Sequence, residues 1–391
     1  MPNAPRRLLM TADAVGGVWA YALELARALA PHGAEVHLAT MGPRPTAAQR
    51  AAAAALGVTL HESDLALEWM DAPWDDVARA GDWLLGLERA LAPDLVHLNG
   101  YAHGACPFRA PTVVAAHSDV CSWWRAVRGE EAPAGWDDYR DAVARGLAGA
   151  DAVVAPTRAV ADDLARAFGP RLAALGASGP AAHVVPNARR AAEYPPAARK
   201  TSAVLTAGRL WDDAKNVRTV ADAVVRAFGR GEADRPWVAY VVGDADPPDG
   251  SGAARDADTG ADAWRGTPGG GEGRVTWLGP LAPDALAAWM ARAAVYALPA
   301  RYEPFGLSAL EAGLAGCALV LGDLPSLREV WGDAALFVAP DDAGQLALAL
   351  RTLAADDDYR AALGARARAR ALAYTPERMA DGYLRAYAAD A

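Results

Sequence analysis

Two glutamates, Glu303 and Glu311, bracket the stretch whose residue types are best suited to chemistry, Glu-Pro-Phe-Gly-Leu-Ser-Ala-Leu-Glu. An apolar run at 293–299 precedes it and favours a buried strand, and helix formers follow at 307–315. The turn between them contains Gly306 and presents backbone N–H groups at the start of the helix. Such a turn suits an anion or another group that accepts hydrogen bonds.

A carboxylate beside an anion-binding turn is electrostatically unfavourable, so the two glutamates indicate a neutral polar ligand such as the hydroxyls of a sugar. The ordinary alternative is a helix with one solvated glutamate and one capping glutamate, and for either residue alone that interpretation is equally good. The spacing favours a site, because seven residues separate Glu303 from Glu311 and Phe305-Gly306 follows closely after the first.

A second candidate group consists of the cations Arg209 and Lys215. They follow an apolar run at 203–207 that predicts a strand, and residues 211–216 are predicted to open a helix that runs through Phe228. Two cations beyond the carboxyl end of a strand and near a helix start can neutralise a diphosphate. As an isolated pair, such residues are more often part of a solvated surface.

The N-terminal half begins with a strand, a glycine loop and a helix over residues 8–30, and Gly16-Gly17 lies in the loop. This pair lets a ligand approach the backbone closely, although a plain tight turn is the commoner use of two glycines. The loop is not a G-x-G-x-x-G fingerprint, so no nicotinamide cofactor is indicated.

Two further predicted strands, 95–98 and 112–116, end in the polar residues Asn99 and His117. Ligands of open parallel sheets bind beyond the carboxyl ends of the strands. His117 is therefore better placed for function than the other histidines, with a surface or capping role as the alternative.

The composition excludes several classes of protein. The chain has 391 residues, of which 53% are hydrophobic, and this is enough for two cores of ordinary size. A net charge of -10 argues against a general nucleic-acid binder. Three cysteines without a C-x-x-C pair indicate neither disulfides nor a zinc site. With no signal peptide and no apolar run of membrane-spanning length, we expect a soluble, cytoplasmic protein.

The pattern of strands and helices predicts two α/β sets joined by a linker at 189–200, which contains Pro195-Pro196. The segment 244–273 is rich in Asp, Gly and Pro and is predicted to be a mobile surface insertion. A helical stripe at the end of the chain, which includes Met379 and Tyr383, should pack on a domain face.

With these residues identified, the chain resembles the family 4 glycosyltransferases of the GT-B type over nearly its whole length. The glutamate pair enclosing Phe-Gly is the specific motif, and the others are persuasive by their order along the chain. The matching pieces are Gly16-Gly17-Val18, His117, Val185-Pro-Asn187, Gly208-Arg209 with Lys215-Asn216, Gly243-Asp244, Gly279, and Glu303-Pro-Phe-Gly-Leu307 with Glu311. The sequence departs from the family pattern at Ala188 and Ala318, where glycine and proline are usual.

The resemblance implies an α/β fold of two Rossmann-like domains that face each other across a cleft. Residues 1–190 would form the acceptor-side domain and residues 200–370 the domain that binds a nucleotide-sugar donor. Residues 371–391 would form a helix that returns to pack on the N-terminal domain.

The resemblance also implies a role for each candidate residue. Arg209 and Lys215 would hold the donor diphosphate, and Glu311 would bind the nucleotide ribose. Glu303 would hold the donor sugar together with the turn amides of Phe305, Gly306 and Leu307. Gly16 and Gly17 would let the N-terminal domain close over the diphosphate, and His117 would lie near the sugar. The residues expected to take part in catalysis are Glu303, His117, Arg209 and Lys215.

The implied activity is transfer of a sugar, with retention of anomeric configuration, from a nucleotide-diphosphate sugar to a hydroxyl of a glycan, a lipid-linked molecule or a small molecule. Peripheral contact with a membrane is compatible with such an acceptor. No metal or other cofactor is expected, because no metal-binding D-x-D stands in a convincing place: Asp256-Ala-Asp258 has that spacing but lies in the predicted insertion. The alternatives are a non-hydrolysing nucleotide-sugar epimerase and a non-catalytic sugar-binding protein on the same scaffold. A pyridoxal-phosphate phosphorylase fits least, because the chain is short for that group and has only two lysines.

Overall fold

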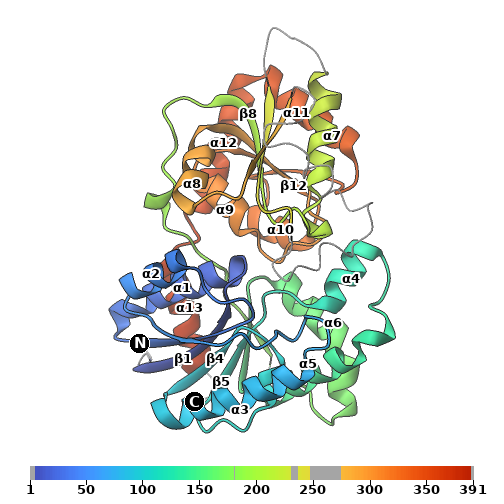
Figure 1. Cartoon of the computed structure of the whole chain (residues 1–391). Coiled ribbons are helices and arrows are strands. Elements are labelled where there is room, and N and C mark those ends of the chain that lie inside the picture. Colours follow the sequence, from blue (N-terminus) through green and yellow to red (C-terminus); the bar gives the residue numbers. More distant parts are fainter. Residues whose placement is uncertain (1–4, 180, 230–236, 247–273, 389–391) are drawn as a thin grey trace. The chain divides into compact units, whose positions relative to one another are not determined.

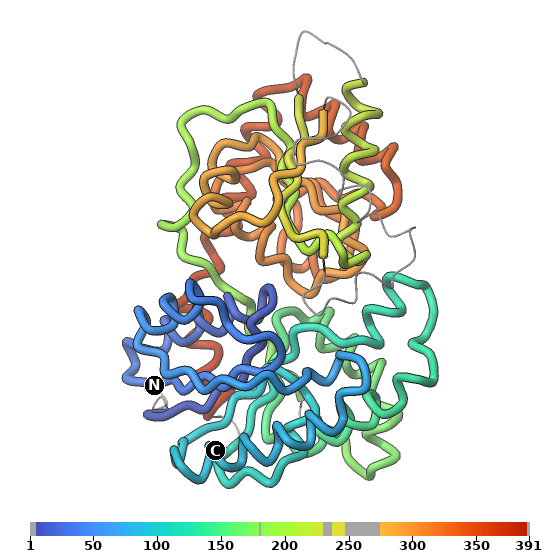
Figure 2. Tube along the Cα trace, in the orientation of Figure 1, coloured from blue at the N-terminus to red at the C-terminus, as the bar shows by residue number. Residues whose placement is uncertain are grey.

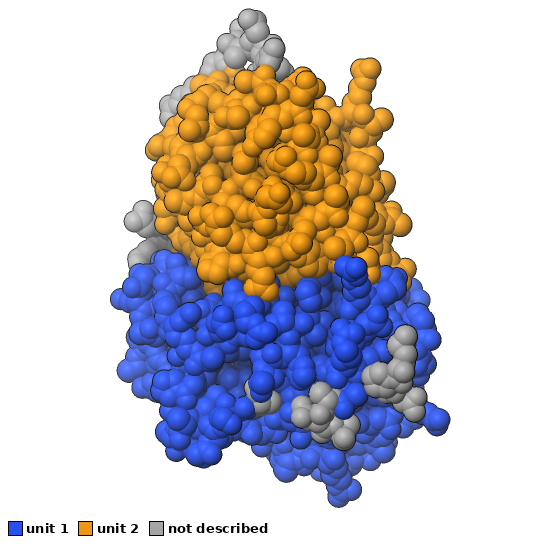
Figure 3. Space-filling model, turned by 180° about the vertical axis from the view of Figure 1, so that it is seen from behind, with its two compact units in different colours: residues 1–188, 376–391 blue, residues 189–375 orange. Residues whose placement is uncertain are grey.

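The computed structural model describes residues 5–179, 181–229, 237–246 and 274–388. The chain divides into two compact units (Figure 3): unit 1 combines Met1–Ala188 with Pro376–Ala391, and unit 2 is Arg189–Thr375. The predicted insertion at 244–273 lies almost wholly outside the described residues, and so do Asp256 and Asp258.

Unit 1 is built on a seven-stranded sheet with the order β3-β2-β1-β4-β5-β6-β7, in which every neighbouring pair is parallel. Its strands are β1 (Arg7–Asp13), β2 (Glu35–Met41), β3 (Thr59–Glu62), β4 (Leu95–Leu98), β5 (Thr112–Ala115), β6 (Ala152–Ala155) and β7 (Ala182–Val184). Its helices are α1 (Gly17–Leu29), α2 (Ala47–Ala55), α3 (Trp74–Leu91), α4 (Val120–Arg128), α5 (Asp137–Gly149), α6 (Arg158–Ala174) and α13 (Pro376–Ala388), with short 3-10 turns that include η2 (Ala102–Ala105).

Unit 2 repeats the plan with a six-stranded parallel sheet in the order β10-β9-β8-β11-β12-β13. Its strands are β8 (Thr201–Ala207), β9 (Val238–Val242), β10 (Val275–Gly279), β11 (Ala293–Leu298), β12 (Ala318–Gly322) and β13 (Leu336–Val338). Its helices are α7 (Val217–Phe228), α8 (Pro283–Arg292), α9 (Leu307–Leu314), α10 (Pro325–Trp331), α11 (Ala343–Ala355) and α12 (Asp357–Ala371).

Helices cover both faces of each sheet (Figure 1), and the sequence explains why. The central strands are continuous apolar runs, as strands must be when both of their faces are buried. In unit 2, Leu205 and Tyr296 point into the core under α8, α9 and α12, while Val204 and Val295 point into the core under α7 and α11. The expected α/β fold of two Rossmann-like halves is confirmed.

The C-terminal helix α13 belongs to unit 1, as expected from the resemblance. In Figure 2 the red end of the tube lies beside the blue N-terminal segment, and α13 packs on α1. The stripe residues Met379, Tyr383 and Tyr387 are all buried. At Gly382 a side chain would come within 2.6 Å of Val185, so a glycine lets the helix approach closely.

The segment 189–200, predicted to be a linker, leads from β7 to β8 and contains one short 3-10 turn over Ala191–Glu193. It belongs to unit 2, and its first residue, Arg189, is only 6% exposed because it is engaged in an ion pair. The helix expected to open at 211 begins later, since a 3-10 turn over Asp213–Lys215 precedes α7. Within the described residues, no helix is both long and apolar enough to cross a bilayer.

Candidate functional site

The loop after β8 and the turn before α9 are joined by an ion pair between Lys215 and Glu303. The lysine Nζ lies 2.7 Å from the glutamate Oε2, and the two side chains are 16% and 11% exposed. The lysine stem packs on the backbone of Gly208, where a Cβ would come within 3.2 Å of it. Unit 2 thus brings together two of the residues that the sequence singled out.

The turn before α9 is closed by Glu303 itself. Its Oε1 accepts the Gly306 N–H at 3.0 Å, and its backbone carbonyl accepts the Ser326 hydroxyl at 2.5 Å. Gly306 has φ +86°, a conformation that favours glycine, and it immediately precedes Leu307, the first residue of α9. The unfavourable meeting of a carboxylate with this turn is therefore resolved, because Glu303 accepts an N–H of the turn and is neutralised by Lys215.

The side chain of Phe305 packs into the core of unit 2 and holds the turn before α9 in place. Its side chain is 2% exposed and packs edge-to-face on Tyr374, with ring centroids 5.6 Å apart. The ring therefore holds the turn in place, and a ligand could be held only through the backbone here. The first amides of a helix such as α9 lack intrahelical partners and can serve that purpose.

Arg209 lies in the same loop as Lys215 but has a different partner. Its Nη2 lies 2.9 Å from the buried carboxylate of Asp212, and its guanidinium sits 5.2 Å from the ring centroid of Trp211. The side chain is still 41% exposed. The loop thus presents an oriented cation to solvent, with Asp212 as its support.

Glu311 forms a second buried ion pair, which the sequence did not reveal. Arg189 Nε donates to its Oε1 at 2.8 Å, and the side chains are 6% and 13% exposed. Burial, and next the negative charge of Glu311, raise the pKa of the neighbouring Tyr194. Arg189 lies two residues after Asn187, the end of the Val-Pro-Asn motif noted in the sequence, and this position was the only available signal.

In unit 1, His117 follows β5 and is half-buried. Its Nε2 lies 2.7 Å from Oδ1 of Asn99, and its ring meets Tyr21 edge-on at 4.4 Å between centroids. Burial lowers the pKa of His117 to about 4, so the ring is neutral at pH 7.

Gly16 and Gly17 lie at the start of α1, where Gly16 is the capping residue with φ +80°. The loop is tightened by Asp13, whose Oδ1 accepts the Val15 N–H at 2.8 Å. The glycine loop and His117 therefore belong to unit 1, while Arg209, Lys215, Glu303 and Glu311 belong to unit 2.

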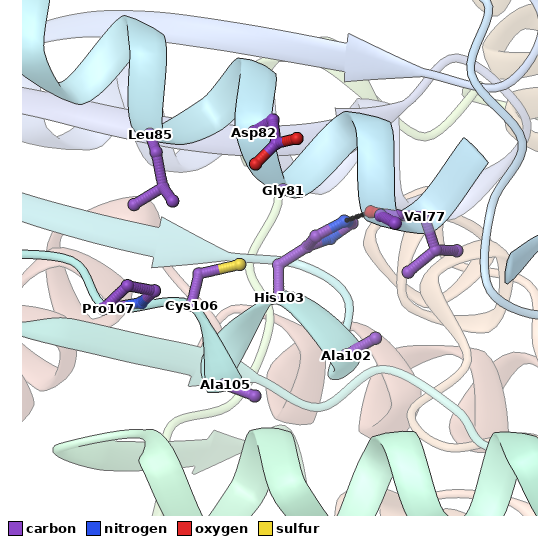
Figure 4. A pocket seen from close by; sticks show the side chains of 10 residues that line it. Val77, Gly81, Asp82, Leu85, Ala102, His103, Ala105, Cys106 and Pro107 are labelled. Atoms are coloured by element: carbon purple, nitrogen blue, oxygen red, sulfur yellow. Dashed lines mark hydrogen bonds between the residues drawn. The ribbon is translucent and has the colours of Figure 1, made fainter. Parts of the chain in front are cut away.

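A separate cavity of about 290 Å³ lies in unit 1 between α3 and η2 (Figure 4). His103 points toward α3, where its Nε2 lies 3.0 Å from the carbonyl oxygen of Val77. Burial, and next the charge of Asp82, raise the pKa of the Cys106 thiol, so this cysteine is a poor nucleophile. Within the part of the chain that the structure describes, no cluster of three or more His, Cys, Asp or Glu side chains could hold a metal ion.

The two parallel-sheet units define the GT-B class of fold. The structure superimposes on that of a sucrose-phosphate synthase from Thermosynechococcus elongatus with a TM-score of 0.73, at 19% identity and covering 96% of each chain. The Anabaena protein HepE in complex with UDP-glucose gives a TM-score of 0.70 at 17% identity, covering 96% of this chain and 97% of HepE.

Sequence comparison identifies the family. A model described as Glycosyltransferase Family 4 matches residues 15–176, and one described as Glycosyl transferases group 1 matches residues 201–356. The chain belongs to the family 4 glycosyltransferases.

Among curated relatives, the glycogen synthase of Mycobacterium tuberculosis is 29% identical over 325 residues, which is 77% of this chain and 70% of that protein. The O-antigen chain mannosyltransferase B of Escherichia coli is 33% identical over 116 residues. That alignment spans about 30% of each chain.

Proposed function

We propose that the protein transfers a sugar from a nucleotide-diphosphate donor to the hydroxyl of an acceptor, with retention of anomeric configuration and without a metal ion. The observation that carries the proposal is the joining of the β8 loop to the α9 turn by Lys215 and Glu303. This arrangement places a cation, a carboxylate and the amides of a helix start in one place. Such a set suits a ligand that is anionic at one end and rich in hydroxyls at the other.

In this proposal, Arg209 and Lys215 hold the diphosphate. Arg209 is held by Asp212 yet 41% exposed, so it can add charge-assisted hydrogen bonds to phosphate oxygens without a large loss of side-chain freedom. Lys215 supplies a compact charge whose direction is set by Glu303 at 2.7 Å. HepE, which shares the fold, is described in complex with UDP-glucose, and this supports a nucleotide sugar as donor.

In this proposal, Glu303 and Glu311 each bind one of the two sugar rings of the donor. Glu303 and the first amides of α9 bind the transferred sugar, and Glu311 binds the ribose. A carboxylate has about four acceptor positions. Arg189 occupies one of those of Glu311 at 2.8 Å, so the carboxylate is fixed in orientation and can still accept hydroxyls.

For the chemical step, we propose attack on the face that the leaving group departs from. The bond between the anomeric carbon and the diphosphate oxygen breaks, and the acceptor oxygen bonds to the same carbon. The acceptor proton passes to the departing phosphate, so no protein nucleophile is needed. Arg209, Lys215 and the α9 amides stabilise the charge that develops on the diphosphate.

The experiment has two stages. Nucleotide sugars are first screened for thermal stabilisation, since a ligand at 100 times its Kd adds about 2.7 kcal/mol to the free energy of unfolding. Stabilising donors are then incubated with glycan, lipid-linked and small-molecule acceptors, and the anomeric configuration of the product is read by proton NMR. A product of inverted configuration contradicts the mechanism. Interconversion of the nucleotide sugar without any acceptor would identify an epimerase instead.

A further inference from the structure

Asn99 occupies the carboxyl end of β4, between β1 on one side and His117 on the other. Its backbone N–H donates to Thr11 Oγ1 at 2.8 Å, and its side-chain Nδ2 donates to the Thr11 carbonyl oxygen at 2.6 Å. Its Oδ1 lies 2.7 Å from Nε2 of His117. Thr11 is 2% exposed, so these bonds are made in the interior of unit 1.

The contact with Thr11 settles which way the amide of Asn99 points. The Thr11 carbonyl can only accept a hydrogen bond, so the atom at 2.6 Å from it must be the amide nitrogen, which donates. The atom that faces His117 is then the amide oxygen, which can only accept. Oxygen and nitrogen of an amide are assigned from such networks, and here the backbone of β1 makes the assignment.

The orientation of Asn99 in turn determines which nitrogen of His117 carries the proton. The ring is neutral at pH 7, because burial lowers the pKa of His117 to about 4. A neutral imidazole has one donor and one acceptor nitrogen. Since Nε2 faces an acceptor at 2.7 Å, Nε2 carries the hydrogen and Nδ1 is left as an acceptor.

A second layer of hydrogen bonds from α13 and α1 holds this arrangement. His97 is fully buried, with Nδ1 2.8 Å from the Tyr387 hydroxyl and Nε2 3.3 Å from Oδ1 of Asn99. The Tyr21 hydroxyl lies 3.2 Å from the same Nε2 and 2.5 Å from the Tyr383 hydroxyl. Because these groups are buried and hydrogen-bonded, Asn99 has little freedom to turn.

We propose that Asn99 is a positioning residue that holds His117 in the Nε2–H tautomer, so that Nδ1 accepts a hydrogen bond from a hydroxyl of the bound sugar. The sugar contact rests on the proposed function, whereas the tautomer does not. Asn99 acts through His117 and need not touch the substrate.

The tautomer is measured directly in the full-length protein labelled with 15N at histidine, by long-range proton–nitrogen correlation NMR at pH 7.5. The His117 signals are assigned by their loss in His117→Gln. We expect the Nε2–H pattern in the parent protein. His103 provides an internal reference, because its Nε2 faces the Val77 carbonyl at 3.0 Å and must carry its hydrogen there. An Nδ1–H pattern for His117 in the parent protein overturns the proposal without any variant.

Two variants test whether Asn99 is the cause. Asn99→Leu keeps a similar size but removes the acceptor, so we expect His117 to become a mixture of tautomers while His103 is unchanged. Asn99→Asp keeps an acceptor, so Nε2–H should persist and the pKa of His117 should rise toward that of a paired histidine. If Asn99→Leu does not fold, the aspartate variant decides. An unchanged tautomer in a folded Asn99→Leu, or an unchanged pKa in Asn99→Asp, contradicts the proposal.

The kinetic arm separates this inference from the proposed function. With a donor that the parent protein uses, Asn99→Leu should lower kcat/KM about five- to tenfold, the effect of one neutral hydrogen bond. Normal kcat/KM in a variant with mixed tautomers overturns the role of Nδ1. If the parent protein transfers no sugar, the proposed function fails, while the NMR result still decides the role of Asn99.

Discussion

Arg189 and Glu311, which are 122 positions apart, form a buried ion pair with Nε 2.8 Å from Oε1. Arg189 is the first residue of unit 2 and Glu311 lies in α9. The pair therefore joins the segment where the chain enters unit 2 to the helix that follows the turn at Gly306. The side chains are 6% and 13% exposed, and water can therefore do little to replace either partner.

Replacing one member of this pair should therefore lower the free energy of unfolding more than replacing both members does. We expect Arg189→Met or Glu311→Leu alone to lower the free energy of unfolding of unit 2 by about 3–5 kcal/mol, because each removes the opposite charge at 2.8 Å from a buried charge. The double variant should recover much of that loss. Urea denaturation of all four proteins measures the coupling, and the exposed pair Arg328 and Asp323 in the same unit should show only a small effect. Additive single losses would mean that the charges are solvated.

The diphosphate assignment predicts that Arg209→Ala and Lys215→Gln each lower kcat/KM by roughly 10²–10³, by analogy with the loss of one donor to a developing charge. Lys215→Gln keeps the stem that packs on Gly208. Arg218→Ala is the matched control. It removes an equal charge, and Arg218 is exposed on the neighbouring helix α7. Circular dichroism and donor-free thermal melts check the fold. Near-normal turnover in both site variants would leave the diphosphate without its proposed partners.

The turn before α9 allows a test of geometry without a change of charge. Gly306→Ala places a Cβ at φ +86° and within 3.1 Å of Leu327, so we expect a loss of roughly 1–2 kcal/mol from the backbone alone. Movement of this turn should also weaken donor binding, since Glu303 accepts the Gly306 N–H. Gly332→Ala, also at positive φ but with open space around it, is the control. Equal donor affinity in both variants would show that the α9 turn does not contribute to the site.

The fold was largely predictable because its signals are local. Strand, turn and helix alternate with apolar runs and glycines that mark each boundary, and the strand predicted at 95–98 is β4 with its observed bounds. The helix α2 was missed because its sequence, AAQRAAAAA, is mostly alanine and offers little contrast between faces. The helix α5 was missed because it starts directly after a tryptophan with no side-chain cap.

The residues of the candidate site were predicted from the sequence, but their pairing was not, and the reason is physical. Residue type and spacing placed Arg209, Lys215 and Glu303 beyond strand ends and Glu311 inside the helix that follows Glu303. They could not show the pairing of the two glutamates with Lys215 and Arg189, because each pair joins segments at least 88 residues apart. A cation in a supposed linker carries no signal of its own, and only the folded chain reveals its partner.

Metal independence is a separate expectation of the proposed mechanism. Arg209 and Lys215 supply the positive charge that a divalent ion would otherwise provide, so activity should survive excess EDTA. The assay compares initial rates with EDTA, with added Mg²⁺ and with added Mn²⁺. Activity that is abolished by EDTA and restored by either ion would show that a metal takes part and would redirect attention to Asp256 and Asp258, which lie outside the described residues.

The buried histidines of unit 1 predict that the protein loses stability as pH falls. Burial, and next the proximity of His117, lower the pKa of His97 to about 3, while burial lowers that of His117 to about 4. An unfolded histidine takes up its proton near pH 6.5. Below that pH the unfolded chain binds protons that the native state does not, so the free energy of unfolding falls with decreasing pH.

The expected slope is about 1.4 kcal/mol per pH unit for each histidine, between pH 6.5 and about 4 for His117 and about 3 for His97. The tyrosines that face His97, namely Tyr21, Tyr383 and Tyr387, have pKa values raised by burial and stay neutral throughout. Burial also raises the pKa values of Glu68 and Asp119. As the pH falls, these carboxyl groups take up protons in the native state before they do so in the unfolded chain, so their contribution to the free energy of unfolding has the opposite sign.

The measurement is therefore a difference between proteins. Urea midpoints are compared at pH 7.0, 6.0 and 5.0 for the parent, for His97→Gln and for His32→Gln, the last being an exposed control. Glutamine cannot take up a proton, so His97→Gln should unfold more readily at pH 7.0 and yet show a shallower loss of stability on acidification. His32→Gln should keep the parent slope. If His97→Gln and the parent lose stability in parallel, His97 is charged or solvated in the native state and the buried network is not as described.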